Sequence, residues 1–480
     1  MGNFFPVHFF MLKEKLYNEF INSSKIDLTK SQAEALRSLA EFILYQKESF
    51  FILKGYAGTG KTTLISIINS VINSFGINTV LLAPTGRASK ILSSITHKPA
   101  YTIHKYIYRK NTSKGFEGRF TLNFNKLKNT IFIVDEASMI NTEKKSENYI
   151  FGSGSLLDDF IEFVFNSYEN KIIFVGDNAQ LPPVQQEKSP ALSEDFLSKY
   201  GYPVSSFELL DITRQAKKSD IIKNATIIRE ILTNKRNISE LKFEASNEVV
   251  LPEPNEVWEY IENSFYNCGK EETAIITVSN KIANAYNSTI RRKIFDYDEE
   301  ITTGDILMVV RNNYLWTHQN APFSFLANGD FLKINNIYGF ENKYGFKFAD
   351  VNVSLLYYPE FSFDVKLLLN TIYANSPALT YEERRKLYEE IASEFNTKNK
   401  KKIYEKLMEN EYFNALEVKF AYAFTCHKAQ GGQWENVFID QGHFNFITPD
   451  NNYLRWIYTA ITRAKNKLYL INFSENFKKE

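Results

Sequence analysis

A glycine-rich segment between an apolar run and a helical pattern constrains the fold of this 480-residue chain more than any other feature. Gly55 and Gly60 are separated by four residues and followed by Lys61 and Thr62, which is the phosphate-binding loop pattern. Residues 50–53 are apolar, and apolar side chains recur at helical spacing from 64 to 72. A glycine-rich turn that matches by chance is the alternative, but the flanking strand and helix patterns argue against it. The segment therefore predicts a strand, a nucleotide-binding loop and a helix.

The chemistry of such a loop assigns roles to its residues. Glycines keep side chains away, so backbone N–H groups surround a phosphate, and the helix start adds its positive dipole end. Lys61 is expected to reach the β- and γ-phosphates, and the Thr62 hydroxyl to bind Mg²⁺. The predicted nucleotide-binding residues of the loop are Gly55, Ala57, Gly58, Thr59, Gly60, Lys61, Thr62 and Thr63.

Composition excludes several other classes of protein. The two cysteines, Cys268 and Cys426, provide neither a disulfide framework nor a zinc site. No window approaches the roughly 18 consecutive apolar residues of a membrane helix, and the first residues lack the pattern of a secretory signal. We therefore expect a cytoplasmic protein with no membrane partner. The net charge is +1, so binding to a nucleic acid requires a local basic groove rather than a basic surface overall.

Strand-like apolar runs alternate with helical patterns along most of the chain. The alternation predicts parallel sheets with helices on both faces. The expected strands are residues 79–83, 130–134 and 171–175, and then 274–278, 418–424, 437–440 and 468–471.

The pattern changes between residues 304 and 414. Short antiparallel strands are expected at 306–310, 331–334 and 346–356, with a turn at Asn328-Gly329, followed by a charged helical stretch at 381–408. This region is predicted to be an inserted domain. The basic run of Lys398 and residues 400–402 is suited to phosphate contacts or to a solvated helix face, and both interpretations stay open.

Polar side chains follow two further apolar strands. Asp135 and Glu136 end the strand at 130–134, where the first carboxylate is expected to bind Mg²⁺ and the second to polarise the attacking water. Asp177 and Gln180 follow the strand at 171–175. Because ligands bind at the carboxyl ends of parallel strands, both are placed to sense the γ-phosphate or that water.

Arginines and a group of polar residues complete the candidates. Arg87, Arg214 and Arg463 are candidates for stabilising charge during phosphoryl transfer. Segments at other strand ends offer hydroxyls, N–H groups and cations suited to a sugar–phosphate backbone. The second ligand that a metal site at His427 would need is missing, which favours a binding role. The residues predicted to contact such a backbone are Pro84, Thr85, Lys90, His104, Tyr106, Thr425, His427, Lys428 and Gln430.

In order, these stretches resemble the motifs of superfamily 1 helicases, and within them the RecD-like, Dda-like group. The resemblance covers residues 28–471. Gln32 matches the adenine-reading glutamine motif. The numbered motifs match residues 55–63 (motif I), 83–90 (Ia), 135–138 (II), 176–184 (III), 213–215 (IV), 426–431 (V) and 458–465 (VI).

The resemblance implies an α/β fold of two RecA-like parallel-sheet domains in tandem. Residues 1–26 are an N-terminal extension with a short amphipathic helix, and 27–211 form the first RecA-like domain, with a small wedge insertion at 105–128. Residues 212–304 and 415–480 form the second RecA-like domain, and 305–414 an inserted SH3-like β-barrel with a helical extension. The wedge aromatics, Tyr106, Tyr108, Phe116, Phe120 and Phe124, either stack on bases or pack a small hairpin.

The resemblance also implies a function. ATP and Mg²⁺ bind between the two RecA-like domains, and Lys61, Asp135, Glu136, Gln180, Arg214 and Arg463 act in hydrolysis, with Thr62 and Asp135 as metal ligands. The expected activity is 5′-to-3′ translocation on single-stranded DNA and unwinding of forked DNA by a monomer, in repair or recombination. Two alternatives stay open: a translocase that does not unwind, and a regulatory nucleotide-binding module without motor activity.

Overall fold

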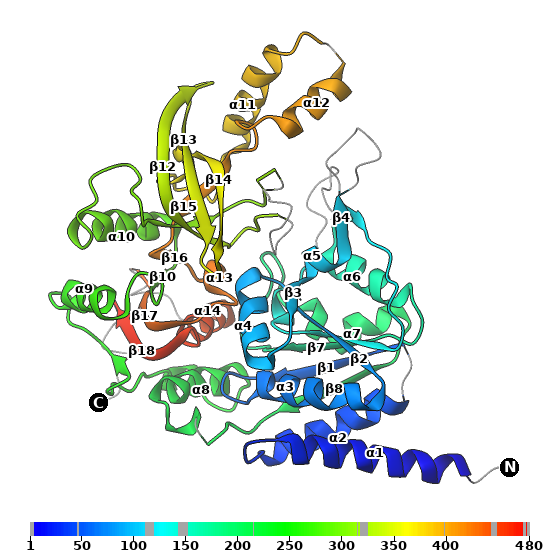
Figure 1. Ribbon diagram of the computed structural model, residues 1–480. Coiled ribbons are helices and arrows are strands. Elements are labelled where there is room, and N and C mark those ends of the chain that lie inside the picture. The colour runs from blue at the N-terminus through cyan, green and yellow to red at the C-terminus, as the bar shows by residue number, and fades with distance from the viewer. Residues whose placement is uncertain are drawn as a thin grey trace. The chain divides into compact units, whose positions relative to one another are not determined.

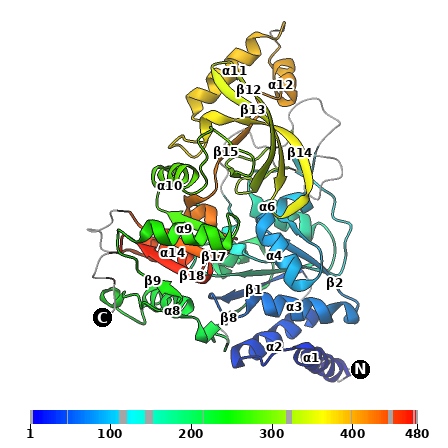
Figure 2. The same ribbon diagram turned by 60° about the vertical axis from the view of Figure 1, so that its left-hand side comes forward.

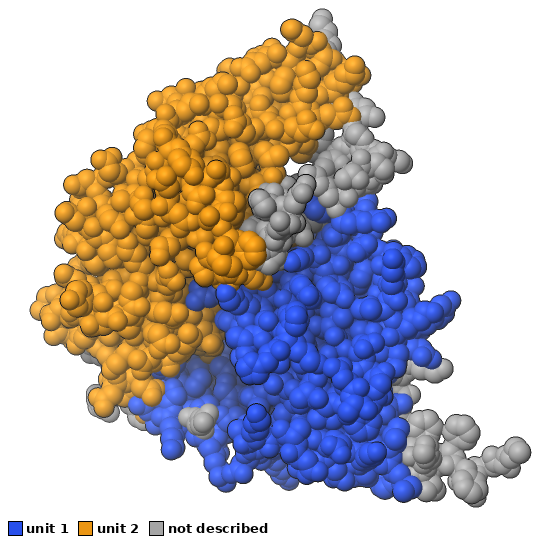
Figure 3. Space-filling model, in the orientation of Figure 1, with its two compact units in different colours: residues 1–109, 120–240, 449–459 blue, residues 110–119, 241–448, 460–480 orange. Residues whose placement is uncertain are grey.

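The computed structural model describes residues 4–45, 48–110, 120–142, 152–214, 216–313, 315–316, 325–397, 399–442, 449–473 and 477. The chain forms two compact units, shown in blue and orange in Figure 3. Unit 1 comprises residues 1–109, 120–240 and 449–459, and unit 2 comprises residues 110–119, 241–448 and 460–480. Within the described ranges, no helix has the length and apolar character needed to cross a membrane.

Unit 1 is built on a six-stranded parallel sheet (Figure 1). Its strand order is β3-β2-β6-β7-β1-β8. The strands are β1 (Ser49–Gly55), β2 (Asn78–Ala83), β3 (Ala100–Thr102), β6 (Thr130–Val134), β7 (Lys171–Gly176) and β8 (Val204–Leu209). The strands predicted around residues 79–83, 130–134 and 171–175 are confirmed. The two edge strands, β3 and β8, were not predicted, because β3 is short and β8 is largely half-exposed.

Helices cover both faces of this sheet, as the alternating pattern predicts. Helices α1 (Phe4–Ser23), α2 (Lys30–Tyr45) and α3 (Lys61–Val71) share one apolar cluster with the alternate strand residues Phe51 and Leu53. On the other face, Phe160 of α6 (Leu156–Phe165) packs edge-on against Phe132 and Phe174. Leu16 and Phe20 of α1 are fully buried, so the N-terminal helix belongs to the core of unit 1.

A small two-stranded sheet of β4 (Tyr108–Lys110) and β5 (Phe120–Leu122) follows helix α5 (Ile103–Ile107). Tyr106 packs edge-on against Phe132 and Phe163, and the buried Tyr108 donates to Asp159 Oδ2 at 2.6 Å. Phe120 is also buried, whereas Phe124 is 69% exposed. Phe116 lies outside the described residues. Of the predicted wedge aromatics, Tyr108 and Phe120 are therefore buried, Tyr106 is half-buried, and Phe124 faces solvent.

Unit 2 contains a five-stranded parallel sheet with strand order β16-β10-β17-β18-β9. The strands are β9 (Val249–Val250), β10 (Thr273–Thr277), β16 (Ala423–Thr425), β17 (Trp434–Asp440) and β18 (Ala464–Ile471). Helix α9 (Val257–Cys268) connects β9 to β10, and α10 (Asn280–Lys293) follows β10.

The prediction of one strand at 418–424 is wrong. The run is divided between β15 (Leu416–Phe420) of the barrel and β16 of the parallel sheet. The change falls at Ala421 and Tyr422, because Ala421 N donates to Ile306 O of the barrel and Tyr422 O accepts from Ile275 N of the sheet. Both strands are buried, so an unbroken apolar run gives no sign of the boundary.

The predicted insertion contains a closed five-stranded barrel, visible above the parallel sheet of unit 2 in Figure 2. Its strands are β11 (Ile306–Val309), β12 (Phe331–Lys343), β13 (Phe346–Leu355), β14 (Tyr358–Leu368) and β15. The pairings are antiparallel except for β14 with β15, which closes the barrel. Strand β14 was not predicted, because its first half is exposed and lacks an apolar run.

The charged stretch at 381–408 forms two helices, α11 (Tyr381–Ser393) and α12 (Lys400–Glu409). Leu387, Ile391 and Leu407 pack against Phe346 and Phe348 of the barrel strand β13. Lys398 and the side chains of Lys400 and Lys401 lie outside the described residues. The predicted fold class, two RecA-like parallel sheets with a small barrel and a helical insertion, is therefore confirmed.

A buried ion pair joins the barrel to the parallel sheet of unit 2. Arg291 of α10 is 3% exposed and donates to both carboxylate oxygens of Asp305 at 3.0 Å. Asp305, fully buried, also accepts from Tyr422 Oη at 2.7 Å and from Thr302 N at 2.7 Å. These bonds fix the start of β11 and the start of β16 against α10.

Candidate nucleotide site

The phosphate loop has the predicted local structure. Strand β1 ends at Gly55 and helix α3 begins at Lys61. Gly58 and Gly60 have φ of +77° and +81°, a backbone region that glycine adopts without strain. A Cβ at Gly60 would lie 2.3 Å from Gln32 Nε2, so the loop has no room for a side chain there. The 11-residue helix α3 begins without a side-chain cap, so its first N–H groups are directed into the loop.

Lys61, Thr62 and Thr63 occupy the first turn of α3. Lys61 Nζ donates to Gly55 O at 2.6 Å and to Tyr56 O at 3.0 Å, which keeps its ammonium group inside the loop. The side chains of Thr62 and Thr63 are partly exposed. The loop therefore brings a cation, a hydroxyl and the positive end of a helix together, a combination that binds phosphate.

Gln32 contacts the loop directly. Its Oε1 accepts from Thr29 N at 2.9 Å and Thr29 Oγ1 accepts from Gln32 N at 3.3 Å, a reciprocal cap at the start of α2. Its Nε2 donates to Thr59 O at 2.9 Å. A glutamine amide has two donors and two acceptor sites, so each end keeps one further bonding position. The buried Gln32 is thus held beside the loop with capacity to recognise a polar ring edge.

Asp135 and Glu136 follow β6, the second strand from β1 in the sheet order. Glu136 has φ of +52°, and its N–H donates to Asp135 Oδ1 at 2.9 Å. Burial and the neighbouring Glu136 carboxylate raise the pKa of Asp135 to about 7, while Lys61 acts in the opposite direction. A divalent cation would relieve this cost.

The donor chemistry fits Mg²⁺. A hydroxyl at Thr62 and a carboxylate at Asp135 are hard oxygen ligands, and Mg²⁺ usually takes one or two protein ligands with phosphate and water for the rest. Among the described residues, His, Cys, Asp and Glu form no cluster of three that would hold an ion by protein ligands alone.

Asp177 and Gln180 follow β7, which lies between β6 and β1. Asp177 is fully buried; its Oδ1 accepts from Ala179 N at 2.9 Å and its Oδ2 from Tyr458 Oη at 2.7 Å. Burial raises the pKa of Asp177, and Lys61 and the Tyr458 hydrogen bond oppose the shift. Gln180 is 5% exposed, and in the described part of the chain its Oε1 has no hydrogen-bond partner.

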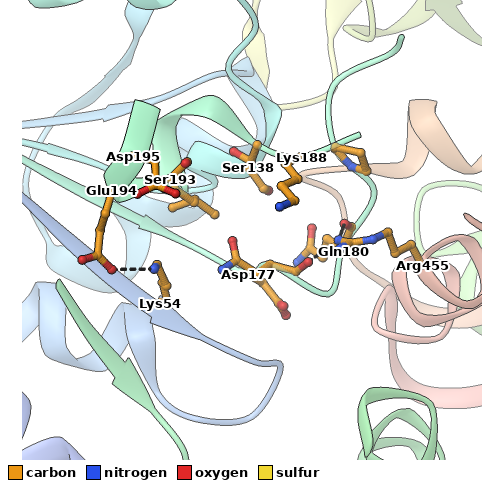
Figure 4. A pocket seen from close by; sticks show the side chains of 13 residues that line it. Lys54, Ser138, Asp177, Gln180, Lys188, Ser193, Glu194, Asp195 and Arg455 are labelled. Atoms are coloured by element: carbon orange, nitrogen blue, oxygen red, sulfur yellow. Dashed lines mark hydrogen bonds and ion pairs between the residues drawn. The ribbon is translucent and has the colours of Figure 1, made fainter. Parts of the chain in front are cut away.

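A pocket of about 450 Å³ lies beside this loop within unit 1 (Figure 4). Asp177 and Gln180 line it together with Ser138, and Lys54 pairs with Glu194 at 3.1 Å on another side. Arg455 also lines it and donates to Asn178 O and, at 3.2 Å, to Gln180 O. The pocket lining is therefore largely polar, carries charges of both signs and includes the predicted γ-phosphate sensors.

The predicted arginines lie in different settings. Arg214 is 86% exposed and pairs with Asp27 at 3.0 Å within unit 1. Arg463 is 3% exposed in unit 2, where it donates to Gly432 O at 3.2 Å and to Thr462 Oγ1 at 3.1 Å. Arg87 lies in the first turn of α4 (Gly86–Thr96).

Two arginines near the loop escaped sequence reasoning. Arg229 of α8 (Asp220–Leu232) lies over the Tyr56 ring, 4.8 Å from its centroid. Arg455 lies on α14 (Asn451–Ile461), one helical turn before Tyr458. The three-residue spacing between Arg455 and Tyr458 could have identified Arg455 from the sequence, because residues three apart share a helix face.

The predicted DNA-binding residues of unit 1 lie after β2 and on α5. Thr85 caps α4 by accepting from Ala88 N, next to Pro84, and Lys90 is exposed. Burial lowers the pKa of His104 to about 4, so this imidazole is neutral at pH 7 and offers a hydrogen bond rather than a charge. Tyr106 packs inward, as described above.

The candidates of unit 2 gather at the carboxyl end of β16. Thr425 ends the strand, His427 and Lys428 lie on α13 (Cys426–Ala429), and Gln430 follows it. Lys428 Nζ donates to Asn328 Oδ1 in the barrel turn, so the barrel contributes to this surface. Burial and the nearby Lys419 lower the pKa of Lys428 to about 8, which leaves it mostly charged at pH 7.

Comparisons with known proteins find similar sequences and structures. Residues 27–232 match the AAA domain family, and residues 420–471 match the UvrD-like helicase C-terminal domain. The uncharacterized protein MJ1519 of Methanocaldococcus jannaschii is 28% identical over 88% of this chain, and the ATP-dependent DNA helicase dda of Enterobacteria phage T4 is 26% identical over 59%. The chain spans 36% of the first relative and 61% of the second. A Pif1 helicase from Bacteroides, solved with ADP-AlF3 and single-stranded DNA, aligns over 95% of both chains with 15% identity and a TM-score of 0.47.

The loop, the acidic pair and the parallel sheet define unit 1 as a phosphate-loop nucleotide-binding domain. Residues 420–471 match the UvrD-like helicase C-terminal domain, and the stretches that resemble helicase motifs occur in the expected order along the chain. The two family matches and the relative dda support a superfamily 1 helicase of the RecD-like, Dda-like type.

Proposed function

We propose that this chain is an ATP-dependent DNA helicase that moves 5′ to 3′ along single-stranded DNA and separates duplex ahead of it. One observation carries the proposal. The neighbouring strands β6, β7 and β1 end, in that order, in the acidic pair, the Asp177–Gln180 loop and the phosphate loop. Since the carboxyl ends of parallel strands meet at one edge, unit 1 gathers cation, carboxylate and amide groups around one phosphate position.

In the proposed reaction, backbone N–H groups of the loop and Lys61 hold the β- and γ-phosphates. Thr62 and Asp135 would hold Mg²⁺, which would supply positive charge beside the phosphate oxygens. Glu136 accepts a proton from the attacking water, and Gln180 orients that water through Oε1, which has no hydrogen-bond partner among the described residues. Gln32 recognises the adenine edge with its remaining donor and acceptor. Arg214 and Arg463 stabilise the charge that develops on the transferred group.

DNA is proposed to contact unit 1 through Pro84, Thr85, Lys90, His104 and Tyr106. In unit 2 the proposed contacts are Thr425, His427, Lys428 and Gln430. These groups combine hydroxyls, an amide and cations, which suit a phosphate backbone without a sequence preference.

The 5′-to-3′ direction, the preference for forked DNA, activity as a monomer and a cytoplasmic location stay predictions. The same holds for the predicted domain boundaries at residues 27, 212, 305 and 415.

Replacing Lys61 with alanine tests the site. The lysine is partly exposed and does not belong to the core, so the variant should fold and still lose ATP hydrolysis and strand separation. The measurement is ATP-dependent release of a labelled strand from a fork, with circular dichroism as the control for folding. Unwinding at the wild-type rate by Lys61→Ala would show that the site is wrongly assigned.

Two other functions make different predictions. A translocase without unwinding would hydrolyse ATP faster with single-stranded DNA yet release no strand from the fork. A regulatory nucleotide-binding module would hydrolyse ATP at one slow rate with or without DNA. The second parallel sheet in unit 2 disfavours the regulatory module, because a simple nucleotide switch does not need it.

A further inference from the structure

Helix α14 is attached to the nucleotide site of unit 1 by three polar side chains. Tyr458 Oη accepts from Ala57 N at 2.9 Å and donates to Asp177 Oδ2 at 2.7 Å. Thr459 Oγ1 accepts from Leu181 N at 2.8 Å. Arg455 donates to the carbonyl oxygens of Asn178 and Gln180. The second and third turns of α14 therefore hold both the phosphate loop and the loop after β7.

The Tyr458 hydroxyl has the central position among these groups. Its side chain is 1% exposed and Asp177 is fully buried, so both depend on protein partners. Burial and the Asp177 carboxylate raise the pKa of Tyr458 well above its usual value, which keeps the hydroxyl protonated and able to donate. One hydroxyl thus satisfies a backbone N–H of the phosphate loop and a carboxylate of the neighbouring loop.

The chain leads from this anchor to the predicted DNA-binding segment of unit 2. It passes from unit 1 to unit 2 after Thr459, within α14. Arg463, five residues after Tyr458, donates to Gly432 O at 3.2 Å. Gly432 follows Lys428 and Gln430, both proposed to contact DNA. A short series of hydrogen bonds and covalent links therefore joins the phosphate loop to that segment.

We propose that Tyr458 is a positioning residue that makes ATP hydrolysis respond to single-stranded DNA. Its hydroxyl holds the phosphate loop and Asp177 in one arrangement and ties both to the segment that carries Arg463. The inference rests on the proposed function, because it assigns a coupling role within the same ATPase. Removal of the hydroxyl leaves Ala57 N–H and Asp177 without this shared partner, while the aromatic ring still fills its space.

The test compares Tyr458→Phe with wild type in steady-state ATP hydrolysis, with and without an oligothymidylate strand. We expect the stimulation by DNA to fall at least tenfold through kcat, while the KM for ATP without DNA changes less than threefold. Hydrogen exchange of the nucleotide-free protein gives an independent readout, because the amide of Ala57 should lose protection in the variant.

Tyr422→Phe is the matched control. Tyr422 is fully buried in unit 2, and its hydroxyl also donates to a buried carboxylate, Asp305, and accepts a backbone N–H, that of Ile306, at 3.2 Å. The control should lose comparable stability but keep stimulation by DNA within twofold of wild type.

Each contrary result has a distinct meaning. Stimulation within twofold of wild type in Tyr458→Phe, unchanged exchange at Ala57, or an equal loss in Tyr422→Phe would overturn the coupling role. A wild-type protein whose hydrolysis does not respond to DNA would instead contradict the proposed function, and the coupling role would fall with it.

Discussion

Replacing Asp135 with asparagine is expected to stabilise metal-free unit 1 while it abolishes ATP hydrolysis. The folded protein raises the pKa of this carboxyl from 3.8 to about 7, chiefly by burial and by Glu136. At about 1.4 kcal/mol per pKa unit, the ionised carboxylate costs the folded state at most about 4 kcal/mol. Asparagine is neutral and retains the oxygen that accepts from Glu136 N, so it removes the cost and keeps the hydrogen bond.

The sign of the effect depends on pH. Below about pH 4 both states hold the proton and the carboxyl has no cost. Between pH 4 and pH 7 the Asp135 carboxyl is ionised in the unfolded chain but still protonated in the folded protein. The free energy of unfolding therefore falls by up to about 1.4 kcal/mol per pH unit in this range, and it falls no further above pH 7. Because Asp135 is partly exposed and its charge is screened, we expect about half the maximum, ~2 kcal/mol, at pH 8 and less than ~1 kcal/mol at pH 5.

Urea denaturation in EDTA at both pH values measures this difference, and Glu187→Gln, an exposed carboxylate of unit 1, is the control. Mg²⁺ with ADP should reverse the order, since only the wild-type carboxylate gains from the cation. A variant less stable than wild type at pH 8, or an advantage independent of pH, would refute the electrostatic reasoning.

Two further changes test the packing around the site and within unit 2. Gly60→Ala should weaken ATP binding at least tenfold, because the added Cβ would displace Gln32 Nε2. Gly201→Ala is the control, since Gly201 has the same φ of +81° and an added Cβ there would have no atom within 4 Å. In thermal unfolding the control should lose only the free energy of backbone strain, about 1 kcal/mol. Asp305→Ala should destabilise unit 2 by about 3–5 kcal/mol in urea, because Arg291 is left buried without its carboxylate. A loss below ~1 kcal/mol, typical of an exposed pair, would contradict that assignment.

Short sequence patterns predicted those parts of the site whose residues are neighbours in the sequence. The phosphate loop and the acidic pair each need a strand followed by a few specific residues, so the sequence shows them directly. The same reasoning places β6, β7 and β1 in parallel sheets but does not determine their order. Strand order depends on which sheet edges pair across long stretches of chain, and the structure supplied it.

Contacts between distant residues explain what the sequence did not reveal. Tyr458 lies in a predicted motif, yet its partner Ala57 is 401 residues away, and no local spacing encodes that hydrogen bond. No local pattern distinguished Arg229 from other surface cations, and Arg455 had only its helical spacing from Tyr458. The boundary between β15 and β16 was missed for a related reason, since burial in two different sheets produces one continuous apolar run.

Unwinding of matched duplexes with either a 5′ or a 3′ single-stranded tail tests the central claim most directly. We predict ATP-dependent release of the labelled strand from the 5′-tailed duplex, and release from the 3′-tailed duplex at least tenfold slower. Release from the 3′-tailed duplex alone would contradict the proposed direction. Hydrolysis of ATP without release from either substrate would contradict the assignment of helicase activity itself.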